Sequence, residues 1–185
     1  MRIRTLAGTS TATAATAVVG FLATDPDADW FRELDLPPFY PPPATFPIVW
    51  TALFADIAVT TAAAHGRLEG ADRRALRRSL AVNLALNGAW SWIFWQARSP
   101  RWAALEALAL AVSSAHLVRC VARAHRAAGL ALAPYVAWCT FAAVLCAAIA
   151  HRNPHLQGER GPVEGPLSAA ACAAGTLACA AAAGR

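Results

Sequence analysis

The sequence predicts an all-α, polytopic membrane protein built as a bundle of five transmembrane helices. Hydrophobic residues make up 57% of the 185-residue chain and charged residues 15%, with a mean hydropathy of +0.40, whereas soluble domains carry roughly 25% charged residues. The apolar residues gather into five blocks, each close to the ~20 residues that a helix needs to cross a bilayer. No block alternates apolar and polar residues as a barrel strand does, so these segments are expected to be helices.

The first two blocks lie at residues 5–24 and 44–64. The first follows Met-Arg-Ile-Arg and contains small residues, so a cleaved signal peptide is the competing interpretation. Its long uncharged run has no compact leucine-rich centre, which favours a retained helix. The remaining blocks lie at residues 79–97, 102–118 and 130–150.

The connection between the first two blocks, residues 25–43, is acidic at first and then rich in proline. Its prolines, which include Pro41 and Pro42, remove backbone donors and fix φ, so a stiff, extended lid is favoured over a helix. The connection is longer than a simple link requires, and such loops often cover binding sites. A rigid turn without a binding role is the alternative.

The distribution of arginine predicts the orientation of the bundle. All sixteen basic residues are arginine, and ten of them lie in the N-terminal arm and in the connections at 65–78 and 119–129. In a five-helix chain these segments share one face of the membrane, and arginine-rich loops face the cytoplasm. We therefore expect a cytoplasmic N-terminus in a cell membrane, which places residues 25–43 outside.

Composition gives no sign of a metal or nucleic-acid site. The five cysteines show no metal-ligand spacing and no CxxC pair, so plain buried thiols are expected. The formal net charge of +5 comes from arginines at helix ends, where they anchor a membrane bundle, and no nucleic-acid partner is expected.

Residues 1–153 are assigned to the transmembrane domain, and residues 154–185 to a linker and an alanine-rich C-terminal tail. The linker contains Gly, Pro and Glu, and the run at 167–184 is mostly alanine. Alanine adds little apolar area per residue, so a tail or an interfacial helix is favoured over a short sixth spanning helix.

Four of the predicted helices carry an aromatic or polar stripe at helical spacing. The stripes contain Trp50 and Phe54 on the second helix; Asn83, Asn87, Trp90 and Phe94 on the third; Trp102, Glu106, Ser113 and His116 on the fourth; and Tyr135, Trp138 and Cys146 on the fifth. We expect these stripes to face a common interior, where indoles suit a large, flat ligand.

Several of these polar and aromatic residues also have a structural explanation that involves no ligand. Asn87 fits equally well as a hydrogen bond between helices and as a ligand contact. Tryptophan gathers at membrane interfaces, which accounts for Trp102 better than for Trp90 or Trp138. A carboxyl group within a spanning segment is costly, so Glu106 should face the interior or the interface; Asp56 lies off the Trp50 stripe, and its role stays open.

Three motifs occur in order along the chain. The first is the proline-rich run at 37–42, followed by FPIVWTALF at 46–54. The second covers residues 84–106 and ends in an acid after a tryptophan, and the third is PYVAW at 134–138. Together they resemble the translocator protein family, also called tryptophan-rich sensory proteins or peripheral-type benzodiazepine receptors.

This resemblance implies a five-helix bundle, usually a homodimer, with an interior pocket beneath the first loop that binds porphyrins such as haem precursors. In some members of the family the pocket binds sterols or synthetic drugs. The expected ligand-binding residues are Trp50, Asn87, Trp90, Phe94, Tyr135, Trp138 and Cys146, and the expected lid residues are Trp30, Phe39, Pro41 and Pro42.

The chain also departs from the family pattern. The lid lacks tryptophan at Phe39 and Ala44, and the tyrosine of the second helix is replaced by Phe54. Cys146 and Ala147 replace an asparagine and a tyrosine of the fifth helix. Loss of that tyrosine removes the cholesterol-recognition pattern, which argues against sterol binding.

The leading hypothesis is a non-enzymatic membrane receptor or carrier for porphyrin-type tetrapyrroles, which requires no cofactor and serves tetrapyrrole handling or stress regulation. A photo-oxidative porphyrin-degrading enzyme is the first alternative, although the sequence offers no nucleophile with its base and no nucleotide loop. A regulatory membrane protein that acts through partners is the second. Small residues on the third helix, namely Ala81, Ala85, Gly88 and Ala89, are expected to let two subunits approach closely.

Overall fold

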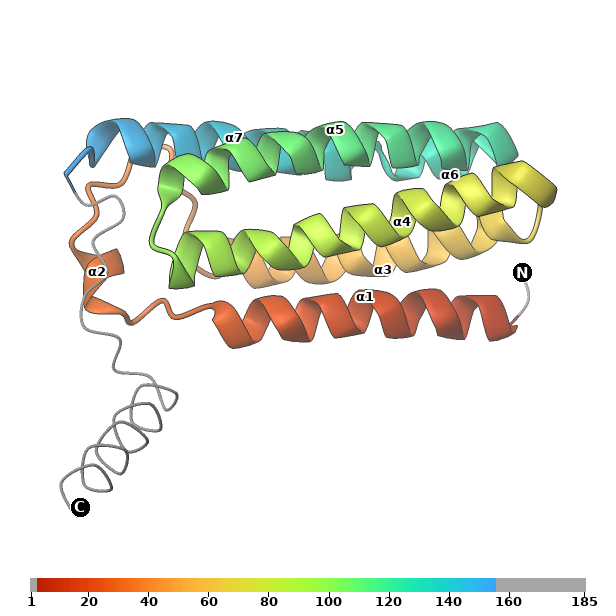
Figure 1. Cartoon of the computed structure of the whole chain (residues 1–185), viewed down its shortest axis with the longest axis horizontal. Coiled ribbons are helices and arrows are strands. Elements are labelled where there is room, and N and C mark those ends of the chain that lie inside the picture. The colour runs from red at the N-terminus through yellow and green to blue at the C-terminus, as the bar shows by residue number, and fades with distance from the viewer. Residues whose placement is uncertain (1–2, 156–185) are drawn as a thin grey trace, which may run out of the picture.

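A computed structural model describes residues 3–155 of the chain as a bundle of long helices (Figure 1). The long helices are α1 (Ile3–Ala23), α3 (Thr45–His65), α4 (Gly70–Ser91), α5 (Pro100–Ala124) and α7 (Ala133–Arg152). The described residues include no strand, and the all-α fold is confirmed. The alanine-rich tail lies outside the described residues.

Three short elements complete the chain. The π-helix η1 (Trp92–Gln96) continues α4 directly, and α2 (Asp29–Arg32) and α6 (Arg126–Ala131) lie in the connections before α3 and α7. We call the end of the bundle that carries α2 and η1 the lid end, and the opposite end the α6 end (Figure 1).

Within the described residues, four helical stretches are long and apolar enough to cross a membrane: α1, α3, α5, and α6 together with α7. The fifth long helix is α4 with η1. Its first turns carry Arg73, Arg74, Arg77 and Arg78, which lower its hydropathy, while its remaining length is the apolar block seen in the sequence. A membrane-embedded helical bundle with roughly the expected five helices is therefore confirmed.

The helices extend further at the α6 end than the apolar blocks indicate. α4 begins at Gly70, within the predicted 65–78 connection, and α5 continues to Ala124. Arginine, alanine and leucine are strong helix formers, so these helices continue beyond their apolar length. The chain reverses before α4 because Gly70 adopts a positive φ of 50°, which costs glycine little.

The order of the helices around the bundle follows from their packing. α5 packs against α7 and α4, and α1 packs against α3 and α4. α3 and α7 are joined by aromatic side chains: the rings of Trp50 and Tyr135 lie 6.3 Å apart, and those of Phe46 and Trp138 lie 6.0 Å apart. The aromatic residues thus close the ring of helices between α3 and α7.

The core consists of two clusters. The cluster toward the α6 end includes the fully buried Ile57, Leu117 and Tyr135, with Trp50 and Trp138 packed against it. The cluster toward the lid end is built around Trp30, Phe94 and Cys146. The pair of Phe46 and Trp138 joins the two clusters, because Phe46 packs against the second and Trp138 against the first.

Candidate ligand pocket

The lid-end cluster brings together aromatic rings from α2, the connection after it, α3, α4, η1 and α7. Trp90 stacks on Phe94 with ring centroids 5.3 Å apart and an angle of 13° between the planes. Trp30 meets Phe94 edge to face at 5.6 Å, and Phe31 lies 4.7 Å from Trp95. These offset and edge-on arrangements are the favoured ones for aromatic pairs. Of the expected pocket residues, Trp90, Phe94 and Cys146 lie in this group.

Asn87 and Tyr135 belong to a hydrogen-bonded set that we call the amide network, whereas the other two expected pocket residues, Trp50 and Trp138, pack against the core cluster toward the α6 end. Asn87 Nδ2 donates to the Tyr135 hydroxyl at 3.2 Å, and that hydroxyl donates to Asn83 Oδ1 at 3.0 Å. Asn83 Nδ2 in turn donates to the Ser114 hydroxyl at 3.0 Å. Asn87 and Tyr135 are therefore engaged with other helices, as the interhelical interpretation of Asn87 expected.

Several polar atoms near the network lie buried without a hydrogen-bond partner. Among the described residues these are Nε1 of Trp90, Nε1 of Trp138, both carboxyl oxygens of Glu106, and the hydroxyl of Ser79. The indole of Trp90 lies beside the Cys146 thiol, which is only a weak acceptor. An unpaired buried polar group costs roughly 1–3 kcal/mol, so most proteins avoid it. The Trp138 N–H is thus left without an acceptor, and the Trp90 N–H has only a weak one.

The lid lies across the end of the bundle and is fastened to α7 by Asn153. The Asn153 side chain accepts a hydrogen bond from the backbone N–H of Asp35 at 2.8 Å and donates to the backbone oxygens of Asp35 and Ile149 at 3.0 and 2.8 Å. An ion pair of 2.9 Å between Arg152 and the Asp35 carboxylate lies beside it. We call this arrangement the Asn153 latch.

The lid is less uniform than the sequence indicates. Residues 29–32 form a helical turn that buries Trp30, in contrast to the extended chain expected before the prolines. The turn forms because Trp30 gains apolar contacts in the lid-end cluster. Phe39 is 48% exposed, and its ring lies 6.4 Å from that of Phe141 on α7. Pro41 is half-buried and Pro42 is exposed.

Tyr40 follows Phe39 in the lid and contacts both Phe31 and Phe46. Burial, together with the nearby Cys146 thiol, raises the pKa of the Tyr40 hydroxyl above its ordinary value. The lid therefore presents a neutral phenol toward the cluster, with no cationic side chain among these contacts.

Two expected stripe members do not face the interior. Trp102 is 66% exposed, as its interfacial interpretation expected, and His116 is also exposed. The inner face of α5 is instead formed by small and aliphatic residues with Ser114. Residues 3–155 contain no group of three or more His, Cys, Asp or Glu side chains placed to hold a metal ion.

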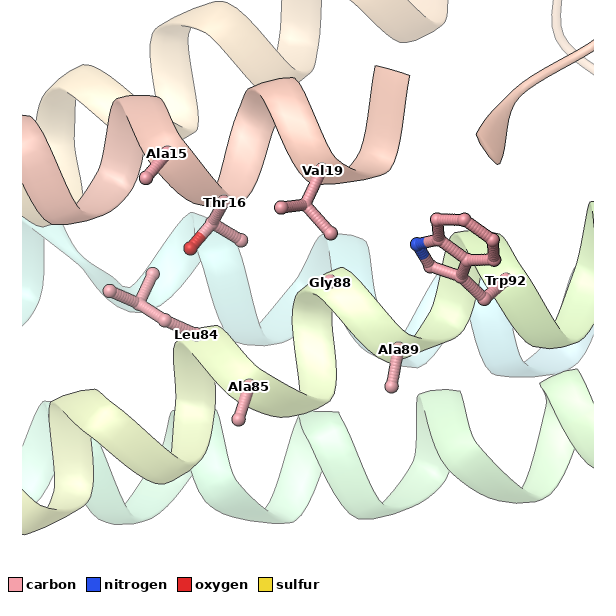
Figure 2. A pocket seen from close by; sticks show the side chains of 8 residues that line it. All are labelled: Ala15, Thr16, Val19, Leu84, Ala85, Gly88, Ala89 and Trp92. Carbon is pink, nitrogen blue, oxygen red and sulfur yellow. The ribbon is translucent and has the colours of Figure 1, made fainter. Parts of the chain in front are cut away.

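A shallow groove of about 420 Å³ runs along the outside of the bundle between α1 and α4 (Figure 2). Its lining includes Thr16, Val19, Ala85, Ala89 and Trp92. Gly88 was expected among the small residues available to a second subunit, but it is buried. A Cβ atom at Gly88 would lie 3.6 Å from Val19 Cγ1, so this position faces α1 within the bundle and does not face a second subunit. Ala81, Ala85 and Ala89 remain exposed.

The sequence and the structure together define the class of the protein as an integral membrane protein made of a helical bundle, with aromatic residues in its interior. A family model described as the TspO/MBR family matches residues 8–152. The chain belongs to this family.

Relatives of both bacterial and mammalian origin are similar to the chain. The tryptophan-rich protein TspO of Chlorobaculum tepidum is 31% identical over 144 residues, which cover 76% of this chain and 90% of the relative. The translocator protein of Sus scrofa is 32% identical over 138 residues, or 73% and 81% of the two chains. The uncharacterized membrane protein YtaB of Bacillus subtilis is 28% identical over 127 residues, or 69% and 82%.

Proposed function

We propose that the protein is a non-enzymatic membrane receptor or carrier that binds porphyrin-type tetrapyrroles in the bundle interior beneath the lid. The observation that carries the proposal is the pair of buried indole N–H groups without a strong acceptor: that of Trp138 has no partner, and that of Trp90 meets only the weakly accepting Cys146 thiol. A flat ligand with edge acceptors would satisfy these donors and stack on the rings around them.

The lid supports the same proposal. It covers the aromatic cluster through Trp30 and Phe31, and the Asn153 latch fastens it to the end of α7. A lid fastened by polar contacts at Asp35 can open there without breaking hydrogen bonds within the long helices. Such a cover suits a ligand that enters and leaves.

Titration of the purified protein with protoporphyrin, followed at the Soret band, tests the assignment. In Trp138→Leu we expect affinity to fall about tenfold, since losing a stacked indole costs roughly 1.4 kcal/mol. Trp92→Leu is the matched control, because Trp92 is 48% exposed on the outside of the bundle. Equal affinities in the two variants would remove Trp138 from the pocket.

Two further features belong to this proposal. Arginines at the starts of α4 and α6 and near the end of α5 lie at the α6 end, which supports a cytoplasmic α6 end and N-terminus in a bacterial cell membrane. The exposed alanines of α4 border the groove of Figure 2 and support a homodimer formed along this face. Crosslinking through single cysteines at Ala85, compared with cysteines at Val144 on α7, tests the dimer face.

A further inference from the structure

A second hollow, of about 480 Å³, lies on the side of the bundle between η1 and α5. We call it the lateral hollow; it is lined by Ile93, Ala97, Ser99, Trp102, Leu105 and Glu106. Its volume falls within the range of small-molecule sites. Trp102 and Leu105 are 66% and 57% exposed, so the hollow opens toward the lipid.

The acidic side chain of the lateral hollow is unusual for its surroundings. Both carboxyl oxygens of Glu106 are buried, and neither has a hydrogen-bond partner within the described residues. None of the ion pairs among residues 3–155 involves Glu106, and the lining offers no basic side chain. The Cys139 and Cys146 thiols lie close enough to interact with it electrostatically, but they do not satisfy its oxygens.

Leaving this carboxyl group unpaired reduces the stability of the ligand-free protein. Packing alone does not account for it, because a leucine of similar size would fill the position without the desolvation cost of a polar group. A hydrogen-bond donor from another molecule would therefore supply the partners that the Glu106 oxygens lack. A metal ion is a poor match, because hard cations require several oxygen ligands and the hollow offers one carboxyl group among mostly apolar side chains.

We propose that the lateral hollow is a binding site for a small, flat organic amine that reaches it from the bilayer, with its N–H groups donating to Glu106 and its apolar body against Ile93, Leu105 and Trp102. This site borders the tetrapyrrole pocket of the proposed function, because Ile93 packs against the lid-end cluster and Glu106 interacts with Cys146, but it opens toward the lipid and not beneath the lid. A phospholipid headgroup does not fit, because Glu106 lies one helical turn deeper than Trp102 from the start of α5 at Pro100.

Fluorescence titration with 9-aminoacridine in phosphatidylcholine nanodiscs tests the site, with empty nanodiscs as the blank. Acridine is the matched probe, since it has the same rings but no amino group. Wild-type protein is expected to bind 9-aminoacridine at least about tenfold more tightly than acridine, because the amine supplies charge-assisted hydrogen bonds. Glu106→Leu should lose this preference and bind both probes equally.

Two further variants test whether the effect is specific to the Glu106 carboxyl group. Glu106→Gln keeps the shape of the side chain and should also weaken 9-aminoacridine binding, while Glu69→Gln, an exposed position at the other end of the bundle, should leave it unchanged. Thermal unfolding without ligand should show Glu106→Leu to be at least as stable as wild type, whereas a structural role for Glu106 predicts a loss.

Three results would overturn the proposal. They are an amine preference that survives in Glu106→Leu, an equal loss of the preference in Glu69→Gln, and displacement of the probe when phosphatidylethanolamine replaces phosphatidylcholine. Protoporphyrin titration of the same samples keeps the two sites apart. Loss of amine binding in Glu106→Leu with porphyrin binding intact supports a separate site, and failure of porphyrin binding alone would leave the lateral hollow unaffected.

Discussion

The middle of the bundle and its lid end use polar residues in opposite ways. In the amide network, Asn83, Asn87 and Tyr135 satisfy one another across α4 and α7. Toward the lid end, the buried carboxyl oxygens of Glu106 have no partner, and the buried indole N–H of Trp90 meets only the weakly accepting Cys146 thiol. Buried polar groups that are hydrogen-bonded to one another fix the positions of the helices. Buried polar groups without a partner lower the stability of the ligand-free protein, and a ligand that pairs with them can remove this cost. The comparison separates structural polar residues from those available for binding.

The largest effect is expected from breaking the amide network. Asn83→Leu removes the acceptor of the Tyr135 hydroxyl and the donor to Ser114, both of which are buried. We expect a loss of roughly 2–3 kcal/mol in the free energy of unfolding, measured by denaturant titration in detergent. Val82→Leu, at an exposed neighbouring position, serves as the control, and equal midpoints for the two variants would show that the network contributes no stability.

A smaller and local effect is expected at the Asn153 latch. Asn153→Ala removes the two hydrogen bonds between its side chain and Asp35 of the lid, and the one that holds this side chain to Ile149 of α7, so the lid should open more readily by roughly 1–2 kcal/mol. Hydrogen exchange should increase about tenfold in residues 29–36 and little elsewhere. Arg152→Gln should change hydrogen exchange far less, because its ion pair with Asp35 is solvent-exposed. A similar increase in both variants would show that the ion pair, and not the Asn153 hydrogen bonds, holds the lid.

Alkaline pH tests the lid through Tyr40. Because burial raises the pKa of Tyr40 in the folded protein, the unfolded chain loses its phenol proton first as pH rises. The stability that Tyr40 contributes is therefore complete below its ordinary pKa and is lost as pH rises toward the folded pKa. In Tyr40→Phe the fall in unfolding temperature above a pH of about 10 should be shallower than in wild type. Identical slopes would mean that Tyr40 titrates as in the unfolded chain.

The smallest effect on stability is expected at Trp90. Its N–H meets only the Cys146 thiol, a weak acceptor, so Trp90→Phe removes at most a weak hydrogen bond and keeps a ring beside Phe94. We expect the free energy of unfolding to change by less than about 1 kcal/mol, since the substitution preserves most of the buried apolar area. Tyr135→Phe is the informative comparison, because it removes the same kind of polar group from the amide network. A larger loss in the free energy of unfolding for Trp90→Phe than for Tyr135→Phe would contradict the distinction between the amide network and the unpaired polar groups.

Much of the fold could be predicted from the sequence, because apolar length alone identifies helices in a membrane. The ends were less predictable: α4 begins at Gly70 because arginines continue a helix beyond its apolar part. The stripes correctly grouped Trp90 with Phe94 and Asn83 with Asn87, but spacing within one helix does not reveal the partner on another. That Asn87 bonds to Tyr135 while Trp138 Nε1 has no acceptor depends on helix rotations that a single sequence does not encode.

The hydrogen bond from Gln96 to the backbone oxygen of Ala23, 2.9 Å long, joins the last residue of η1 to the last residue of α1. The lid begins directly after Ala23, and the Asn153 latch holds it again at Asp35. Its acidic first part is thus tethered at both ends, while the proline-rich remainder has no such polar tether among the hydrogen bonds described. Under the proposed function, a ligand would enter beneath the proline-rich part of the lid, while the acidic part stays fixed to the bundle.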